Sequence, residues 1–138
     1  HQEKLSNVMT LKSRVTLVRG VPAGHGISYG RSFVTEKPTK IATVGIGYGD
    51  GYPRHVSGKG ASVFIRGKRH PIAGRVTMDQ IVVILPDDSD VRSGDEAELF
   101  GPNIPAAEVA SLADTIVWDI FTGITPRVQR IHLGSSGK

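Results

Sequence analysis

Tyrosines and arginines that stand beside glycines are the residues of this sequence best suited to chemistry. Tyr29 lies between a serine and a glycine, Tyr48 and Tyr52 flank a Gly-Asp-Gly run, and Arg75 follows a glycine. A phenol can transfer a proton and a guanidinium can hold a carboxylate, while a neighbouring glycine removes bulk that would keep a ligand away. Core packing explains each tyrosine equally well, so residue type alone leaves both interpretations open.

The segment 45–51, with the sequence GIGYGDG, has the glycine content of a phosphate-binding loop but not its spacing. Its glycines fall at every second position, whereas nucleotide-binding loops need G-x-G-x-x-G or a terminal G-K-[ST]. The pattern therefore predicts a bend where a strand ends and the backbone approaches another segment closely.

Metal, thiol and serine chemistry have no matching pattern in the sequence. The chain has no cysteine, which excludes thiolate zinc sites, cysteine nucleophiles and disulfide scaffolds. No histidine pair has helical i,i+4 spacing, the acidic turn at 87–90 lacks the glycine and terminal glutamate of a calcium loop, and no serine stands in G-x-S-x-G. We therefore assign no metal site and expect surface or hydrogen-bonding roles for His1, His25, His55, His70 and His132.

The composition indicates one globular domain without a membrane or nucleic-acid partner. The 138 residues are 38% hydrophobic and 22% charged, and the longest apolar runs, such as Ile81–Leu85, are far too short for a membrane helix. The net charge of +4 comes from scattered basic residues, with one cluster at Arg66–His70 that is predicted to be an exposed turn. Residues 1–10 do not resemble a signal peptide, so we expect a cytoplasmic protein.

Glycines and prolines separate short β-branched runs, which is typical of an all-β fold. The predicted fold is mainly β, a small Greek-key-like β-barrel or sandwich with one or two short helices near the C-terminus. In the first strand, alternation places Val15 and Leu17 on the same face. Six strands are expected, at residues 11–19, 28–35, 40–46, 61–66, 75–85 and 95–100.

The pattern changes after residue 101. Residues 106–113 have the apolar spacing of a helix, and Pro105 suits its first turn. Residues 115–124 fit either a helix or a strand, because they mix β-branched residues with aromatic ones. Residues 127–133 alternate again and are predicted to close the sheet, and residues 134–138 are expected to form a flexible tail.

Five motifs that follow one another along nearly the whole chain resemble the C-terminal domain of pyridoxal-phosphate-dependent alanine racemases. They are the segments 9–15 (MTLKSRV), 26–30 (GISYG), 44–54 (VGIGYGDGYPR), 71–80 (PIAGRVTMDQ) and 126–128 (PRV). The three central motifs are long and correctly spaced. The resemblance implies a β domain at residues 11–133 and a linker at residues 1–10, which would follow an N-terminal eight-stranded α/β barrel that this sequence lacks.

The resemblance also implies a pyridoxal 5′-phosphate enzyme whose cofactor is anchored outside this sequence. In the family the cofactor forms a Schiff base with a lysine of the barrel, and none of the seven lysines here stands in a similar motif. We therefore assign no cofactor-binding residue within the chain and expect it to be inactive alone. The implied activity is interconversion of L- and D-alanine for peptidoglycan, with a small amino acid as the substrate.

Tyr29 matches the tyrosine that the family uses as its second base. Racemisation needs one base on each face of the planar Cα centre: the barrel lysine serves one face, and the tyrosine takes the Cα proton of the L-enantiomer on the other. The family tyrosine works in the active site of a second subunit, which implies a head-to-tail homodimer. A phenol with a pKa of about 10 is a poor base at neutral pH, so groups of the barrel must favour the phenolate.

Five further residues match family positions around the substrate. Met78 matches the position whose backbone N–H contacts the substrate carboxylate, with Asp79 beside it, and Tyr48 resembles a second tyrosine at the inner mouth of the active site. Arg54 and Arg75 match the polar access path, where a cation attracts the substrate carboxylate. For these two arginines, a structural ion pair is the alternative interpretation.

Alternatives remain for the substrate and for the class of protein. Pro126 stands where some family members have a tyrosine that contacts the cofactor phosphate, which leaves the preference for alanine or serine open and allows a serine/alanine racemase as the parent protein. A non-catalytic β module for dimer contacts or binding is the alternative from another class.

Tyr52, Trp118 and Phe121 are expected to form an exposed patch that the barrel and the partner subunit normally cover.

Overall fold

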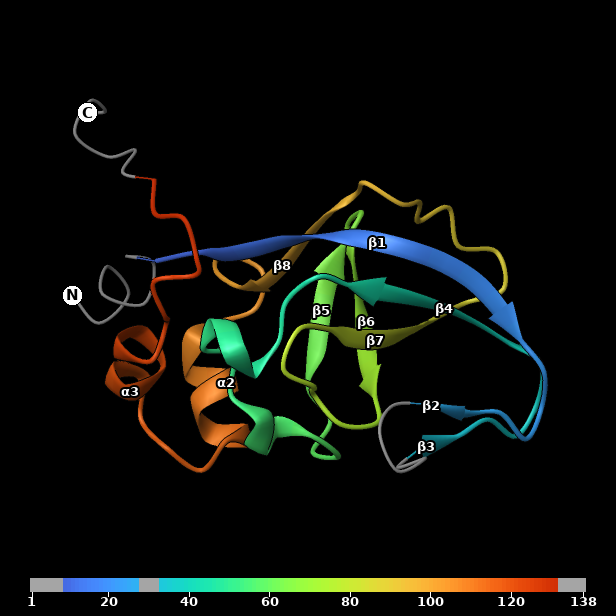
Figure 1. Cartoon of the computed structure of the whole chain (residues 1–138), viewed down its shortest axis with the longest axis horizontal. Coiled ribbons are helices and arrows are strands. Elements are labelled where there is room, and N and C mark those ends of the chain that lie inside the picture. The colour runs from blue at the N-terminus through green and yellow to red at the C-terminus, as the bar shows by residue number, and fades with distance from the viewer. Residues whose placement is uncertain (1–8, 28–32, 132–138) are drawn as a thin grey trace.

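In the computed structural model, residues 9–27 and 33–131 of the chain are described. The core is a closed antiparallel barrel in the order β1–β4–β7–β6–β5–β8, which confirms the mainly β prediction and selects the barrel over the sandwich (Figure 1). The expectations for residues 1–8, 28–32 and 132–138 (most of the linker, part of a strand, and the tail) lie outside the described residues. The barrel strands are β1 (Leu11–Val21), β4 (Thr39–Val44), β5 (Ser62–Ile65), β6 (Lys68–Ala73), β7 (Ile81–Leu85) and β8 (Glu96–Phe100).

The elements outside the barrel lie at its two ends (Figure 1). At one end, β2 (Gly26–Ile27) and β3 (Phe33–Val34) form a two-stranded sheet. At the other end lie the helices, with the short 3-10 turns beside them. Each α-helix has seven residues or fewer, so no helix among the described residues is long enough to cross a membrane. These elements are η2 (Tyr48–Asp50), η3 (Arg54–Val56), α2 (Ala106–Leu112) and α3 (Val117–Thr122).

Alternating apolar side chains of the strands fill the barrel. In β7, Ile81, Val83 and Leu85 are at most 2% exposed, because every second side chain of a strand lies on the same face. Phe100 of β8 extends this core to the helices, where its ring centroid lies 6.0 Å from that of Phe121 in α3. The loops at this end of the barrel therefore rest on a packed core.

A β-bulge in β1 corrects the prediction about its faces. Val15 is buried as expected, but Leu17 is 51% exposed. The pairing with β4 shifts between these residues, so that Val15 lies opposite Val44 and Leu17 opposite Thr43. An extra residue in a strand turns the side chains that follow to the other face, and strict alternation therefore fails at Leu17.

The region 61–85 contains three strands where the sequence predicted two. Residues 75–80 form a loop, and only β7 remains of the strand predicted at 75–85. The additional strand, β6, has no alternating pattern because it begins with charged residues and contains Pro71. The cluster at 66–70 is thus an exposed turn only at its start: His70 is buried, and its Nε2 lies 3.3 Å from the Ile65 carbonyl oxygen.

The C-terminal region has the predicted helix but not the predicted strand. α2 lies within residues 106–113, and the ambiguous residues 115–124 contain the helix α3. The prediction that residues 127–133 close the sheet is wrong for residues 127–131, which form no strand, and residues 132–133 lie outside the described part of the chain. Because β1 pairs with both β4 and β8, the barrel has no free edge for a further strand.

The bulge predicts different effects for two substitutions that the alternation pattern treats alike. Val15→Ala removes buried methyl groups and is expected to lower the free energy of unfolding by about 2 kcal/mol. Leu17→Ala truncates a half-exposed side chain and is expected to change it by less than about 0.5 kcal/mol. Urea unfolding of the two variants measures the difference, and equal losses would contradict the bulge.

Candidate functional site

The pairing of β4 with β7 brings two loops to one end of the barrel. Val44, the last residue of β4, pairs with Ile81, the first residue of β7. Because the strands are antiparallel, the loop after β4 (residues 45–52) and the loop before β7 (residues 74–80) leave the sheet side by side. These loops carry most of the residues that the family resemblance places at the active site.

The two loops touch through their backbones, at glycines. The Tyr48 N–H donates to the Thr77 carbonyl at 2.9 Å, and the Gly49 N–H donates to the Met78 carbonyl at 2.9 Å. A Cβ on Gly47 would lie 2.1 Å from the Thr77 carbonyl oxygen, which is too close for any side chain. The prediction of a bend with a close backbone approach is therefore confirmed.

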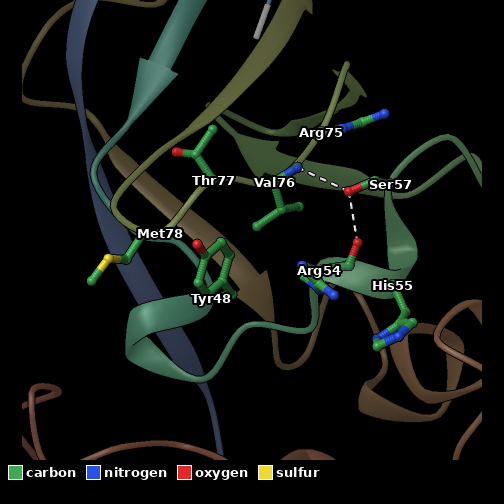
Figure 2. A pocket seen from close by; sticks show the side chains of 8 residues that line it. All are labelled: Tyr48, Arg54, His55, Ser57, Arg75, Val76, Thr77 and Met78. Carbon is green, nitrogen blue, oxygen red and sulfur yellow. Dashed lines mark hydrogen bonds between the residues drawn. The ribbon is translucent and has the colours of Figure 1, made fainter. Parts of the chain in front are cut away.

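A pocket of about 630 Å³ opens where these loops meet η3 (Figure 2). Figure 2 shows Tyr48 and Met78 on one side of it and Arg54 and His55 on the other, whereas the Arg75 side chain extends away from the Tyr48 ring. The structure thus brings together four of the six residues predicted at the active site. The lining residues are Tyr48, Arg54, His55, Ser57, Arg75, Val76, Thr77 and Met78.

Ser57 joins the end of η3 to the loop before β7. Its Oγ accepts a hydrogen bond from the Val76 N–H at 2.9 Å and donates one to the Arg54 carbonyl at 2.7 Å (Figure 2). Arg54 is thereby held at the pocket. Sequence reasoning missed Ser57 and His55, because neither stands in a motif; their nearness to Arg54 in the chain was the available signal.

The Met78 backbone N–H donates no hydrogen bond to any residue in the described part of the chain. Its neighbours are paired, since the Val76 N–H donates to Ser57 and the Thr77 N–H donates to the Gln80 carbonyl. None of the described residues accepts a hydrogen bond from the Met78 N–H. An available backbone donor close to arginines suits a carboxylate ligand.

Arg54 forms no ion pair with any residue in the described ranges. Its positive charge is therefore not consumed by a protein carboxylate there, which favours a ligand role over the structural alternative for this arginine.

Asp79 lies beside the pocket and does not line it. Its carboxylate accepts a hydrogen bond from Arg127 Nη2 at 2.8 Å. Arg127 Nε also lies 3.4 Å from a carboxylate oxygen of Asp50. The hydrogen bond to Asp79, together with the Asp50 charge, raises the pKa of the Arg127 guanidinium. Sequence reasoning gave Arg127 no role, although it belongs to the family motif 126–128.

Pro126 is exposed and lies outside the pocket.

Tyr52 corrects the prediction of an exposed patch. It is fully buried, and its hydroxyl has no hydrogen-bond partner among the described residues. Burial, and to a smaller extent the Glu108 carboxylate, raises the pKa of this phenol, so Tyr52 stays neutral. Of the other predicted patch residues, Trp118 is 68% exposed, whereas Phe121 is partly buried against Phe100.

Tyr29 lies outside the described residues. No lysine among the described residues lines the pocket. Among residues 9–27 and 33–131, no group of three histidine, aspartate or glutamate side chains could hold a metal ion.

The chain is a small closed β-barrel, and the pocket at its end is lined by two arginines, a tyrosine and the residue with the available backbone N–H. These features suit a domain that receives a carboxylate ligand. Residues 8–132 match the family described as "Alanine racemase, C-terminal domain", and the chain belongs to this family.

Individual relatives agree with this assignment. The chain is 51% identical to the alanine racemase of Alteromonas mediterranea over 123 residues. This alignment covers 89% of this chain and 34% of the relative. It is 49% identical over 137 residues to the alanine racemase of Symbiobacterium thermophilum, and this alignment covers 96% of this chain and 36% of the relative. The chain therefore spans about a third of the length of these relatives.

Solved structures share the fold. The alanine racemase from Streptomyces coelicolor superposes with a TM-score of 0.86 at 43% identity, over 93% of this chain and 34% of that one. The alanine racemase from Bartonella henselae, solved with covalently bound pyridoxal phosphate, superposes with a TM-score of 0.85 at 36% identity. The superposition covers 90% of this chain and 34% of that one.

The close approach of the loops predicts that Gly47→Ala separates them. The new Cβ would lie 2.6 Å from the Met78 carbonyl carbon, so the backbone must move, and the free energy of unfolding should fall by about 3 kcal/mol. Gly20→Ala is the matched control, because nothing lies within 4 Å of its Cβ position; its expected change is below about 0.5 kcal/mol. Similar effects of both substitutions on urea unfolding would argue against the close approach.

Proposed function

We propose that the chain is the domain of an alanine racemase that completes the active site for interconversion of L- and D-alanine, with residues 11–133 as its bounds. The observation that carries the proposal is the pocket that Tyr48, Arg54 and Met78 line together. An α-amino acid has a carboxylate, and a backbone donor with nearby cations binds a carboxylate through charge-assisted hydrogen bonds. Membership of the family and the names of the relatives support the same activity.

Pyridoxal 5′-phosphate is the proposed cofactor of the complete protein, with an anchor outside the described residues. Of the lysines that the structure describes, none lines the pocket, Lys12 pairs with Glu96, and Lys40 donates to the Ser89 carbonyl. The described pocket therefore does not fit the role of the covalent anchor. When bound, the cofactor supplies an electron sink that makes the substrate Cα proton more acidic.

The residues of this chain would bind and orient the substrate. The Met78 N–H donates to a carboxylate oxygen, Arg54 and Arg75 attract the carboxylate to the pocket, and Tyr48 shapes its mouth. Tyr29 would move the proton on one face of Cα. A preference for alanine over serine as the substrate is part of the proposal. Pro126 lies outside the pocket and favours neither substrate.

The proposed assembly is a head-to-tail homodimer in which Tyr29 acts in the partner subunit's site. An N-terminal barrel domain is the other proposed partner, in agreement with relatives about three times as long as this chain. Exposed apolar side chains such as Trp118 (68%) and Ile116 (64%) offer surface for such contacts. The proposed role is cytoplasmic supply of D-alanine for peptidoglycan.

Tyr29→Phe in the full-length protein tests the proposed base. Loss of the phenol oxygen is expected to lower kcat for L-to-D conversion by about 100-fold or more, while the absorbance of the bound cofactor stays the same, because its anchor lies elsewhere. D-alanine formed from L-alanine with added pyridoxal 5′-phosphate is the measurement. Unchanged turnover would rule out Tyr29, and an unsubstituted protein without activity would favour the non-catalytic β module.

A further inference from the structure

The Arg127 guanidinium connects the two loops that form the pocket. Its Nη2 donates to the Asp79 carboxylate at 2.8 Å, and its Nε lies 3.4 Å from the Asp50 carboxylate. Asp50 in turn accepts the Gly47 N–H at 2.9 Å and so closes the η2 turn that carries Tyr48. One cation therefore ties the turn of Tyr48 to the residue that follows Met78.

Arg127 does not line the pocket itself. It lines a separate hollow together with Asp50, Lys12 and Arg14. Arg127 therefore makes no contact with a ligand in the pocket, and it acts there through its charge, through Asp79 and through the loops.

Backbone contacts hold Arg127 in place. Two residues earlier, Thr125 donates its N–H to the Asp50 carbonyl at 3.0 Å and its hydroxyl to the Gly49 carbonyl at 3.0 Å. A Cβ on Gly49 would lie 2.2 Å from Arg127 Nη1, so the guanidinium occupies the space that this glycine leaves open. An arginine with a fixed neighbouring backbone and a head group packed over a glycine loses less conformational freedom in an ion pair than an ordinary surface arginine.

We propose that Arg127 is a positioning residue: it neutralises Asp79 and holds it beside Met78, so that the Met78 N–H receives a substrate carboxylate without a competing negative charge. The inference rests on the proposed function. Without the guanidinium, the Asp79 carboxylate stands one residue from the donor and repels an incoming carboxylate.

Kinetics of the full-length protein with Arg127→Ala test this role. KM for alanine is expected to rise about tenfold and kcat to change less than about threefold, because binding rather than proton transfer is affected. Arg127→Lys keeps the charge but not the two-sided geometry, so its KM should be intermediate. Arg66→Ala is the matched control: Arg66 is 47% exposed against 48% for Arg127, also pairs with two aspartates, and lies outside the pocket. Its KM should equal that of the unsubstituted protein.

The double variant Arg127→Ala/Asp79→Asn separates this electrostatic role from a purely structural one. Removal of the Asp79 charge should return KM to within about twofold of the unsubstituted value. A lost cross-link alone would leave KM high. An unchanged KM in Arg127→Ala, or a high KM in the double variant, overturns the proposal. If Arg127→Ala does not fold, Arg127→Lys and Arg127→Lys/Asp79→Asn provide the same comparison.

Acetate binding to the chain provides a readout that does not depend on activity. Acetate should shift the ¹H–¹⁵N resonance of the Met78 amide, with half-saturation at about tenfold higher concentration in Arg127→Ala and recovery in the double variant. Equal acetate binding in the unsubstituted and Arg127→Ala chains overturns the proposal. If the unsubstituted full-length protein does not racemise alanine but acetate binding responds as expected, the proposed function fails while the role of Arg127 stands.

Discussion

The pocket depends on two backbone hydrogen bonds between the loop after β4 and the loop before β7. They bring the Tyr48 turn against Thr77 and Met78, and they require that Gly47 has no Cβ. Each bond contributes only about 1 kcal/mol, so their importance lies in geometry. A side chain at Gly47 would push the loops apart and separate Tyr48 from the Met78 N–H.

The barrel and its surroundings support this contact from several sides. The pairing of Val44 with Ile81 makes both loops start at the same level of the sheet. On the pocket side, Ser57 joins η3 to Val76, and on the other side Arg127 ties Asp50 to Asp79. The closed barrel beneath gives these loops a fixed base.

Local patterns in the sequence predicted what depends on local geometry. The spacing of glycines in 45–51 indicated a close backbone approach, and the structure has one at Gly47. The mainly β class and the helix at 106–113 also followed from pattern. That Tyr48, Arg54, Arg75 and Met78 lie together was predicted from the family resemblance. Spacing alone cannot show that two loops meet across β4 and β7.

What the sequence did not reveal depends on contacts between distant segments. Tyr48 and Tyr52 flank the same glycines, yet Tyr48 is exposed and Tyr52 is buried, since the chain between them turns through η2 toward the core. The bulge that exposes Leu17 is visible only in the pairing of β1 with β4. Likewise, whether residues 127–131 add a strand depends on barrel closure by β1, which no local pattern reports.

A crystal structure of the full-length protein with pyridoxal 5′-phosphate, the proposed cofactor, and an unreactive alanine analogue would test whether the pocket binds a substrate carboxylate at the Met78 N–H. We expect the carboxylate of the analogue within hydrogen-bond distance of the Met78 N–H, beside Tyr48, with the Arg127–Asp79 ion pair intact. An analogue bound elsewhere, with the Met78 N–H donating to a protein acceptor, would contradict it.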